Sequence, residues 1–313
     1  MIDIVINFKN YRSSKANKLK SNNNETDKKV SIDTIILRVK LTDEQKEFIY
    51  DRFYYGFHRS KHYRYSLYFD EMGFTLQLSP KKSVLHSYFN ATITLHRKFF
   101  QRDYIPHSII DILTFIDWSI VRLDIAFDYK ISKQNSLLFK HHGNLKDASY
   151  ENETYYVGNH KSQKKSHTLV NYDRNIKEIK RGTGIHHEYS NRLETRFKFK
   201  MADMKLSNMN HNLIHNKLKK YLFLSDIDQL NTIGYRKNRI RKMQHNYKQL
   251  DTYDKKEAAT IRKLIKTQRE PLEEIYKSNI TNLFDFMNYK ETYLIKLATL
   301  EVATELIGMV NHG

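Results

Sequence analysis

The sequence has 313 residues and contains no cysteine. The absence of cysteine excludes disulfides, thiolate zinc sites, iron–sulfur clusters and cysteine nucleophiles, and it favours a reducing, cytoplasmic location. Proline and glycine are also scarce, with 3 and 9 residues, whereas 40% of the chain is hydrophobic and 13% is aromatic. This composition is typical of a folded globular protein rather than a low-complexity chain.

Long hydrophobic runs are missing as well. No apolar stretch of the sequence approaches the roughly 18 residues that a membrane span requires. Residues 1–20 lack the continuous hydrophobic core of a signal peptide. We therefore expect a soluble protein with no membrane association.

Several common catalytic motifs do not occur. The sequence contains no Walker A, GxGxxG, GxSxG or His-Glu-x-x-His motif, so kinase, NTPase and serine-hydrolase activities lose their main support. His211 and His215 have the spacing of a helical metal pair, but they lie in a basic segment without an obvious acidic companion. That setting favours solvated or phosphate-facing histidines.

Acidic residues are outnumbered, with 35 Asp and Glu against 54 Lys and Arg, which leaves a net charge of +19. An excess of this size favours a polyanionic partner such as nucleic acid. Most of the excess falls in two segments, +7 over residues 158–200 and +8 over residues 205–248.

The distribution of apolar residues predicts an α+β fold. Residues 11–30 have almost no apolar side chains, and residues 1–30 are predicted to form a flexible basic tail. Period-two patterns predict strands over 32–41, 63–69, 74–78, 91–95, 120–130, 155–158, 167–172 and 192–201, and helices are predicted over 42–52 and 106–118. After Asp203 the pattern is helical to the end.

Because the strands occur as hairpin-like pairs and the long helices are gathered at the end, antiparallel sheets are favoured over a doubly wound parallel sheet. We therefore divide the chain into the tail (1–30), an α+β catalytic region (31–202) and a mainly helical region (203–313).

Two predicted strands carry acids among bases on one face. Asp124 alternates with core residues in 120–130, and Glu194 does so in 192–201. If the charged faces are aligned in one sheet, these carboxylates offer hard oxygen ligands for Mg²⁺ or Mn²⁺. Asp128 is a less certain ligand because it lies about 13 Å from Asp124 along a strand at ~3.3 Å per residue. Taken by spacing alone, the pattern also fits an exposed sheet face with paired surface charges.

Tyr172 ends a strand inside the first basic segment. One tyrosine among 22 proves nothing by itself, since most must serve in packing. Its setting is distinctive because Lys161, Lys164 and Lys165 precede it and Arg174 follows it, so a phosphate there would meet several cations.

The second basic segment, 205–248, is the strongest sequence-level candidate for duplex DNA contact. Only Asp226 and Asp228 oppose its cations. The candidate DNA-binding residues in it are Arg236, Lys237, Arg239, Arg241 and Lys242. A solvated helix face is the alternative, and a charge of +8 favours nucleic-acid contact over it.

Three segments together resemble the Rep-trans family of rolling-circle plasmid initiators, which is related to relaxases of some integrative elements. They are Val121-Arg122-Leu123-Asp124-Ile125-Ala126-Phe127-Asp128, then Tyr155-Tyr156-Val157-Gly158 through Ser162 to Tyr172-Asp173-Arg174, and then Arg192-Leu193-Glu194-Thr195-Arg196. The order and approximate spacing of the motifs agree over Ser119–Met201. Asn171 and Arg174 depart from the residues that are common beside the family's tyrosine.

The resemblance implies a nuclease- or relaxase-like core and a site-specific nicking and joining enzyme. In such enzymes a tyrosine attacks a phosphodiester at the plasmid origin, becomes linked to the 5′ phosphate and frees a 3′-OH primer. By this resemblance Tyr172 is the nucleophile, and Asp124 and Glu194 are metal ligands. Asp128 is a ligand or supports one, and Arg122, Arg192 and Arg196 clamp phosphate or orient carboxylates. The family also implies a homodimer that recruits a host helicase.

Three functions remain open from the sequence. The first is a plasmid rolling-circle initiator, and the second is a relaxase of a mobile element with the same chemistry. The third is a non-catalytic DNA- or RNA-binding protein in which Tyr172 packs or stacks on a base, and an apolar, buried Tyr172 would favour it.

Overall fold

The computed structural model describes residues 27–53, 56–82, 88–102, 105–140, 148–151, 154–157, 167–244 and 247–284. Its strands are β1 (Lys28–Val39), β2 (Tyr63–Phe69), β3 (Phe74–Pro80), β4 (Ala91–His96), β5 (Ser119–Tyr129), β6 (Leu137–Lys140), β7 (Ala148–Glu151), β8 (Thr154–Val157), β9 (His167–Asp173), β10 (Asn191–Lys198) and β11 (Tyr221–Leu224). Its α-helices are α2 (Asp43–Phe53), α4 (Arg97–Phe100), α5 (His107–Phe115), α6 (Arg174–Arg181), α7 (His211–Leu218), α8 (Gly234–Lys242), α9 (Lys255–Gln268) and α10 (Leu272–Leu283), and the short 3₁₀ helices are η2 (Lys133–Asn135) and η4 (Tyr247–Thr252).

One antiparallel sheet organises the fold. Its nine strands lie in the order β2-β3-β4-β1-β5-β10-β9-β8-β7, and β11 pairs with β6 in a separate two-stranded sheet. Sheet and helices make an α+β protein, which confirms the fold class predicted from the sequence. The strongest strand prediction also holds, because β5 covers all but the last residue of the segment predicted over 120–130.

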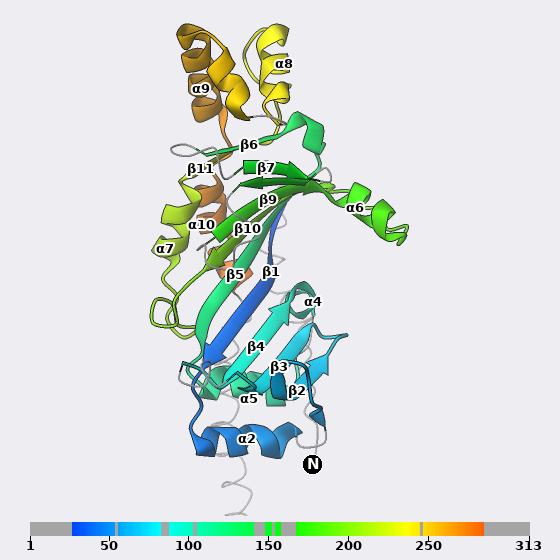
Figure 1. Cartoon of the computed structure of the whole chain (residues 1–313), viewed down its shortest axis with the longest axis vertical. Helices are drawn as coiled ribbons and strands as arrows, with labels where there is room; N and C mark the ends of the chain where they lie inside the picture. The colour runs from blue at the N-terminus through cyan, green and yellow to red at the C-terminus, as the bar shows by residue number, and fades with distance from the viewer. Residues whose placement is uncertain are drawn as a thin grey trace, which may run out of the picture.

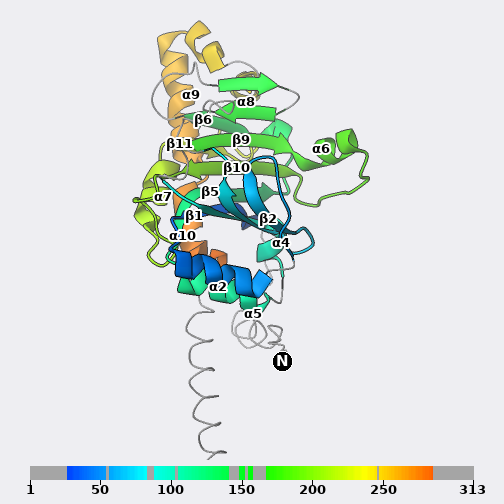
Figure 2. The same ribbon diagram turned by 60° about the horizontal axis from the view of Figure 1, so that its bottom comes forward.

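Helices cover one face of the large sheet. The side chains of Leu123, Ile125 and Phe127 point from β5 into this covered face and are at most 1% exposed. Helices α2 and α5 lie side by side across one end of the sheet, whereas α7 and α10 lie along its middle (Figures 1 and 2). Trp118 closes the core at the α5 end, where its indole Nε1 donates a hydrogen bond to the Ile112 carbonyl at 2.8 Å. The opposite face of β5 carries the charged residues.

Several boundaries differ from the sequence predictions. Strand β1 begins at Lys28, inside the segment predicted as tail, because Lys28 pairs with Tyr129 of β5. Helix α5 ends at Phe115 rather than continuing through Trp118. The predicted β2–β3 hairpin does form, and Gly73 at its turn has a φ of 67° that few other residues adopt.

The part of the chain after Asp203 is not purely helical. Strand β11 lies in it and pairs with β6, which follows β5 in the chain, so Phe223 opposes Leu138. Its four residues are all buried, and a short fully buried strand gives no period-two signal that sequence reasoning can detect. Within the described residues, no helix is both long enough and apolar enough to cross a bilayer.

Candidate functional site

Three carboxylates from three adjacent strands meet on the open face of the sheet. Asp33 of β1, Asp124 of β5 and Glu194 of β10 each place an oxygen within 4.8 Å of the other two, and we call them the acidic group. Asp124 is fully buried and Glu194 is 8% exposed. Asp124 and Glu194 are the two acids that the sequence pairs, and Asp33 is a further member that it does not predict.

A β-bulge explains why the alternation of residues along β1 does not predict the face on which Asp33 lies. If side chains alternated strictly along β1, Asp33 would lie on the covered face together with Ile35 and Leu37, which are both fully buried. The register of β1 against β5 shifts between Ile32 and Thr34, which leaves Asp33 as the extra residue. A bulge of this kind re-aims a side chain, and here the carboxylate of Asp33 reaches the open face.

Arginines hold every member of the acidic group. Arg122 forms a two-point ion pair with Asp124, with its Nε at 2.9 Å from Oδ1. Arg196 donates to both Asp124 and Glu194, at 3.2 and 3.0 Å. Arg192 completes the set with a 3.0 Å contact from Nη1 to Asp33.

The acidic group fits a divalent cation of the hard type. All three donors are carboxylate oxygens, and two oxygens bound to one Mg²⁺ at ~2.1 Å can be at most ~4.2 Å apart. Small side-chain movements therefore suffice to close the 4.8 Å arrangement on one ion. Burial, and then the charges of Asp33 and Asp124, raise the pKa of Glu194. A bound cation would relieve this repulsion between carboxylates.

Asp128 lies outside the acidic group. Arg192 holds it with a two-point pair, Nε to Oδ1 at 2.6 Å and Nη2 to Oδ2 at 2.8 Å. Arg97 and Arg174 approach the same carboxylate at 3.7 Å each. We call Arg97, Arg174 and Arg192 the arginine cluster. Since Arg192 also contacts Asp33, Asp128 is connected to the acidic group through one shared arginine.

The arginine cluster has more positive charge than Asp128 neutralises. Burial lowers the pKa of Arg97, and the charge of Arg192 lowers it further. The Arg97 Nε is buried and has no hydrogen-bond partner among the described residues. For Arg192, burial also acts to lower the pKa, but hydrogen bonds to Asp128 and its charge outweigh burial and raise the pKa overall. The cluster is thus suited to receive an anion such as phosphate.

Tyr172 lies beside both groups on the same face. On β9 it is the register partner of Arg192, which is itself the partner of Asp128 on β5. Burial raises its pKa to about 12; the charge of Glu194 adds to this rise, and the charge of Arg192 opposes it. The residue is 7% exposed, so it is buried, and Lys177, Glu194 and Arg196 are among the residues beside it.

A cavity of about 400 Å³ opens beside Tyr172, and Glu194, Arg196 and Lys177 share its wall. The Lys177 ammonium lies 4.3 Å from the centre of the Tyr172 ring. Burial, and then the charge of Arg181, lower the pKa of Lys177. The cavity gives a negatively charged substrate access to the tyrosine edge of the site.

The chain turns into helix α6 directly after Tyr172. Asp173 caps the helix, and its carboxylate accepts hydrogen bonds from the backbone N–H groups of Asn175 and Ile176 at 2.8 and 3.1 Å. This cap places Arg174 in the arginine cluster and Lys177 over the tyrosine ring. The two cations next to Tyr172 are therefore positioned by one local motif.

Asn171, which departs from the family pattern, has a structural role that the sequence did not suggest. It is 3% exposed on the covered face of β9. Its amide Nδ2 donates to Asn191 Oδ1 at 2.7 Å and to the Arg192 carbonyl at 3.1 Å. These bonds tie β9 to β10 at the position where Tyr172 faces Arg192.

Other candidates from the sequence have different environments. Lys161, Lys164 and Lys165 lie outside the described residues. His211 and His215 contact α10 through Tyr276 Oη at 2.8 Å and the Glu273 carbonyl at 3.2 Å. His215 is buried, so the expectation of a solvated or phosphate-facing histidine is wrong for it, whereas His211 stays partly exposed.

Helix α8 contains the basic residues predicted to contact duplex DNA. Acidic partners neutralise much of the positive charge of these residues. Arg236 pairs with both oxygens of Glu257 at 3.1 Å, and Arg239 approaches the same carboxylate at 3.4 Å. Arg241 pairs with Asp228. Lys242 is exposed and forms no ion pair with any described residue. The net charge of this segment therefore exceeds the charge that is free to meet DNA.

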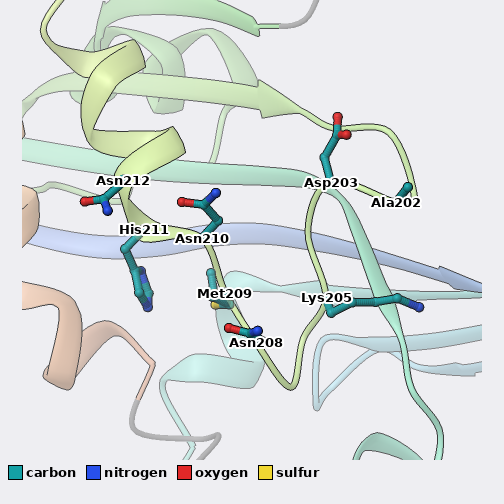
Figure 3. Close-up of a pocket in the computed structure, with 8 residues that line it drawn as sticks. All are labelled: Ala202, Asp203, Lys205, Asn208, Met209, Asn210, His211 and Asn212. Carbon is teal, nitrogen blue, oxygen red and sulfur yellow. The ribbon is translucent and has the colours of Figure 1, made fainter.

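A second cavity, of about 530 Å³, lies away from these residues. It follows the loop between β10 and α7 and the start of α7, and its walls are formed by Ala202, Asp203, Lys205, Asn208, Met209, Asn210, His211 and Asn212 (Figure 3). One acid and one histidine among neutral amides make a poor set for metal binding or proton transfer. This cavity therefore carries no candidate set for such chemistry.

Comparisons with known proteins leave the family open. No family model and no curated protein sequence matches this chain. A rolling circle replication initiator protein from Geobacillus stearothermophilus is among the solved structures that match, at 12% sequence identity and a TM-score of 0.38, over 76% of this chain and 97% of that one. Similarity at this level establishes neither a shared activity nor a shared mechanism.

Proposed function

We propose that this protein is a site-specific DNA nicking and joining enzyme that uses Tyr172 as its nucleophile and a divalent cation held by the acidic group. The observation that carries the proposal is the position of Tyr172 beside three clustered carboxylates and three clustered arginines at one sheet face. Phosphoryl transfer needs a nucleophile, charge neutralisation and phosphate orientation at one point, and these residues supply all three.

The reaction exchanges one ester for another. The Tyr172 Oη attacks a DNA phosphorus, the bond from phosphorus to the 3′ oxygen breaks, and a 5′-phosphotyrosyl link forms. The phenol gives its proton to water, and the departing 3′ oxygen takes one from water. Because the number of phosphoester bonds is unchanged, the strand can be rejoined by the reverse reaction without ATP.

Each charged group has a role in this scheme. Asp33, Asp124 and Glu194 would hold Mg²⁺ or Mn²⁺, which when bound supplies charge neutralisation at the phosphate and the leaving oxygen. The arginine cluster, which lies beside Tyr172, orients the phosphate. Asp128 holds Arg192 of this cluster in place. Arg122 and Arg196 hold Asp124 and Glu194 in place.

Within this class we propose a rolling-circle initiator that cuts plasmid origin DNA and frees a 3′-OH primer. The proposal rests on the motif resemblance, which also implies the homodimer and the host helicase. The proposed division at residues 202 and 203 between catalytic and recognition regions rests instead on the residue pattern and the charge. A relaxase of a mobile element would use the same site. Burial of Tyr172 to 7% exposure is the observation that favours a non-catalytic DNA- or RNA-binding protein instead.

The test uses supercoiled DNA that carries the gene of this protein and its upstream region, incubated with the full chain and Mg²⁺. We expect relaxed circles and a covalent protein–DNA adduct whose tryptic peptide contains Tyr172. The cut strand should have a 3′ end that a polymerase extends. An adduct on any of the other 21 tyrosines would overturn the assignment of the nucleophile, and a protein that binds this DNA without forming an adduct would favour the non-catalytic function.

A further inference from the structure

A row of partly exposed side chains crosses the open face of the sheet from the acidic group to its far edge. Successive register partners on β10, β5, β1, β4, β3 and β2 form this row, which consists of Lys198, Arg122, Ile36, Thr94, Thr75 and Tyr68. All six are intermediate or exposed. Figure 1 shows these strands following one another from the middle of the sheet to its β2 edge. We call these six residues the cross-strand row.

The row starts at the site and ends on an aromatic ring. Arg122 pairs directly with Asp124 of the acidic group. With strands ~4.8 Å apart, five spacings place Tyr68 roughly 24 Å from Lys198. The two ends of the row are thus separated by a distance that several nucleotides of an extended strand can span.

Tyr68 presents its ring as a platform. It is 40% exposed, the His58 ring lies 4.9 Å away, and its hydroxyl accepts a 3.4 Å hydrogen bond from Gln77. These contacts hold the ring at the surface instead of burying it. A held, exposed aromatic ring is the element on which an unpaired base stacks.

Cations without acidic partners lie along the β2 edge of the sheet, where the row ends. The segment Phe57–Phe69 contains no acidic residue, and Asp70 and Glu71 follow it in the turn after β2. Exposed cations in and beside it are Arg59, Lys61, Arg64, Lys81 and Lys82, and none of them forms an ion pair with any residue that the structure describes. Arg64 shares the face of Tyr68 by period-two alternation along β2. This free charge contrasts with α8, where Glu257 and Asp228 occupy the arginines.

We propose that the cross-strand row binds single-stranded DNA, with a base stacked on Tyr68 and the backbone held by Arg64 and its neighbouring cations. A sheet face with an exposed aromatic residue suits unpaired bases, whereas a duplex keeps its bases stacked inside. The strand would run across β3, β4 and β1 toward Tyr172. Its identity as the strand that is cut rests on the proposed function, but the binding surface itself does not depend on catalysis.

Anisotropy titration of a fluorescein-labelled 20-nucleotide single strand tests the proposal, with the full chain in EDTA so that no cleavage occurs. We expect Tyr68→Ala to weaken binding by roughly 5- to 100-fold, the range for loss of one stacked base, and Tyr68→Phe to bind like the wild type. Arg64→Gln should weaken binding and flatten its salt dependence.

Tyr65→Ala is the matched control. Tyr65 is 41% exposed on the same strand, but its ring packs against Tyr50 at 5.4 Å on the other face of the sheet. Wild-type affinity in Tyr65→Ala with weak binding in Tyr68→Ala supports the row. Equal affinity in both variants, or equal loss in both with a lowered melting temperature, overturns it.

A crosslinking experiment keeps the proposal testable if Tyr68→Ala does not fold. The wild-type protein is irradiated with a strand that contains 5-iodouracil, and we expect the crosslinked peptide to contain Tyr68. Crosslinks confined to other peptides overturn the proposal. Because both measurements are made without metal, a protein that binds through this row but forms no adduct at Tyr172 refutes the proposed function alone.

Discussion

Arg192 and Asp128 face each other across neighbouring strands and form a two-point ion pair with contacts of 2.6 and 2.8 Å, and their side chains are only 5% and 3% exposed. Arg192 also holds Asp33 of the acidic group and is the register partner of Tyr172. This one guanidinium therefore links the tyrosine, the acidic group and the arginine cluster.

Asp128→Asn should lower the free energy of unfolding by about 3–5 kcal/mol, because it removes the two-point counter-charge of a buried guanidinium that keeps only its contact with Asp33. Urea denaturation measures the change. The matched control is Asp43→Asn, since Asp43 pairs with Lys46 while its side chain is 92% exposed. We expect the free energy of unfolding to stay close to the wild-type value there, because the pair is exposed to solvent. Similar losses in the two variants would contradict the structural role of the Arg192 pair.

Tyr172→Phe should abolish nicking and the covalent adduct while origin binding stays within about twofold of wild type, because only the attacking oxygen is lost. Gel electrophoresis under denaturing conditions detects the adduct. Tyr189→Phe, a change at another buried tyrosine, should retain full activity. Adduct formation by Tyr172→Phe at the wild-type rate would show that another residue attacks.

Asp33→Asn, Asp124→Asn and Glu194→Gln should each weaken Mn²⁺ binding at least tenfold, because each removes one charged oxygen from the acidic group. Calorimetric titration of the DNA-free protein measures this without any need for activity. Asp128→Asn should have a smaller effect, since Asp128 acts on the acidic group only through Arg192. The discriminating case is Asp33, and unchanged Mn²⁺ affinity in Asp33→Asn would remove it from the site.

Asp33 is the member of the acidic group that the sequence pattern could not predict. The period-two pattern is regular in β10 and, from Leu123 onward, in β5. The shared face of Asp124 and Glu194 could therefore be predicted from spacing, and their register agrees with it. A bulge breaks that period in β1, and nothing in residues 31–35 marks the bulge in advance. The missing ligand candidate was therefore hidden by backbone geometry rather than by composition.

The net charge of a segment could be counted from the sequence, but the ion-pair partners of its residues could not be predicted. The excess over 205–248 pointed to Arg236 and Arg239, yet both lie on Glu257, which is contributed by the following helix. The cations along the β2 edge were not predicted to bind DNA, because the segment that contains them has a smaller excess of positive charge. Long-range pairing depends on tertiary packing, which local patterns do not encode. The same limit applies to β11, whose partner β6 lies more than 80 residues earlier in the chain.

The ionisation of Tyr172 provides a test at high pH. Its pKa of about 12 lies above the ordinary value near 10 because of burial and then the charge of Glu194. The phenol should therefore remain protonated at pH 10–11, where ordinary tyrosines ionise. Since the folded state keeps a proton that the unfolded chain loses, this residue reduces stability as pH rises from about 10 to about 12, and it has no effect below that window.

Carbon-13 NMR of Cζ-labelled tyrosine reports this ionisation, with the Tyr172 resonance assigned by its absence in Tyr172→Phe. Glu194→Gln should lower the pKa, because it removes a negative charge that favours the neutral phenol. An unchanged or higher pKa in Glu194→Gln would mean that the carboxylate does not act on the tyrosine.

The last prediction separates the free and paired cations of α8. Lys242→Gln should weaken origin duplex binding and reduce the slope of log affinity against log salt by about one, because one phosphate contact is lost. Its melting temperature should not change, since Lys242 forms no ion pair with any described residue. Arg236→Gln should instead lower the melting temperature by several degrees, because Glu257 loses its two-point partner.

Cleavage of a short single strand that contains the nick site should survive both changes. Lys266→Gln removes one exposed positive charge from α9. It is the control for an effect of charge that does not depend on a position in α8. If Lys242→Gln binds the origin like wild type but no longer cuts the short strand, α8 belongs to the active site. Recognition of the duplex would then have to be assigned to another surface, with the cations along the β2 edge the first to test.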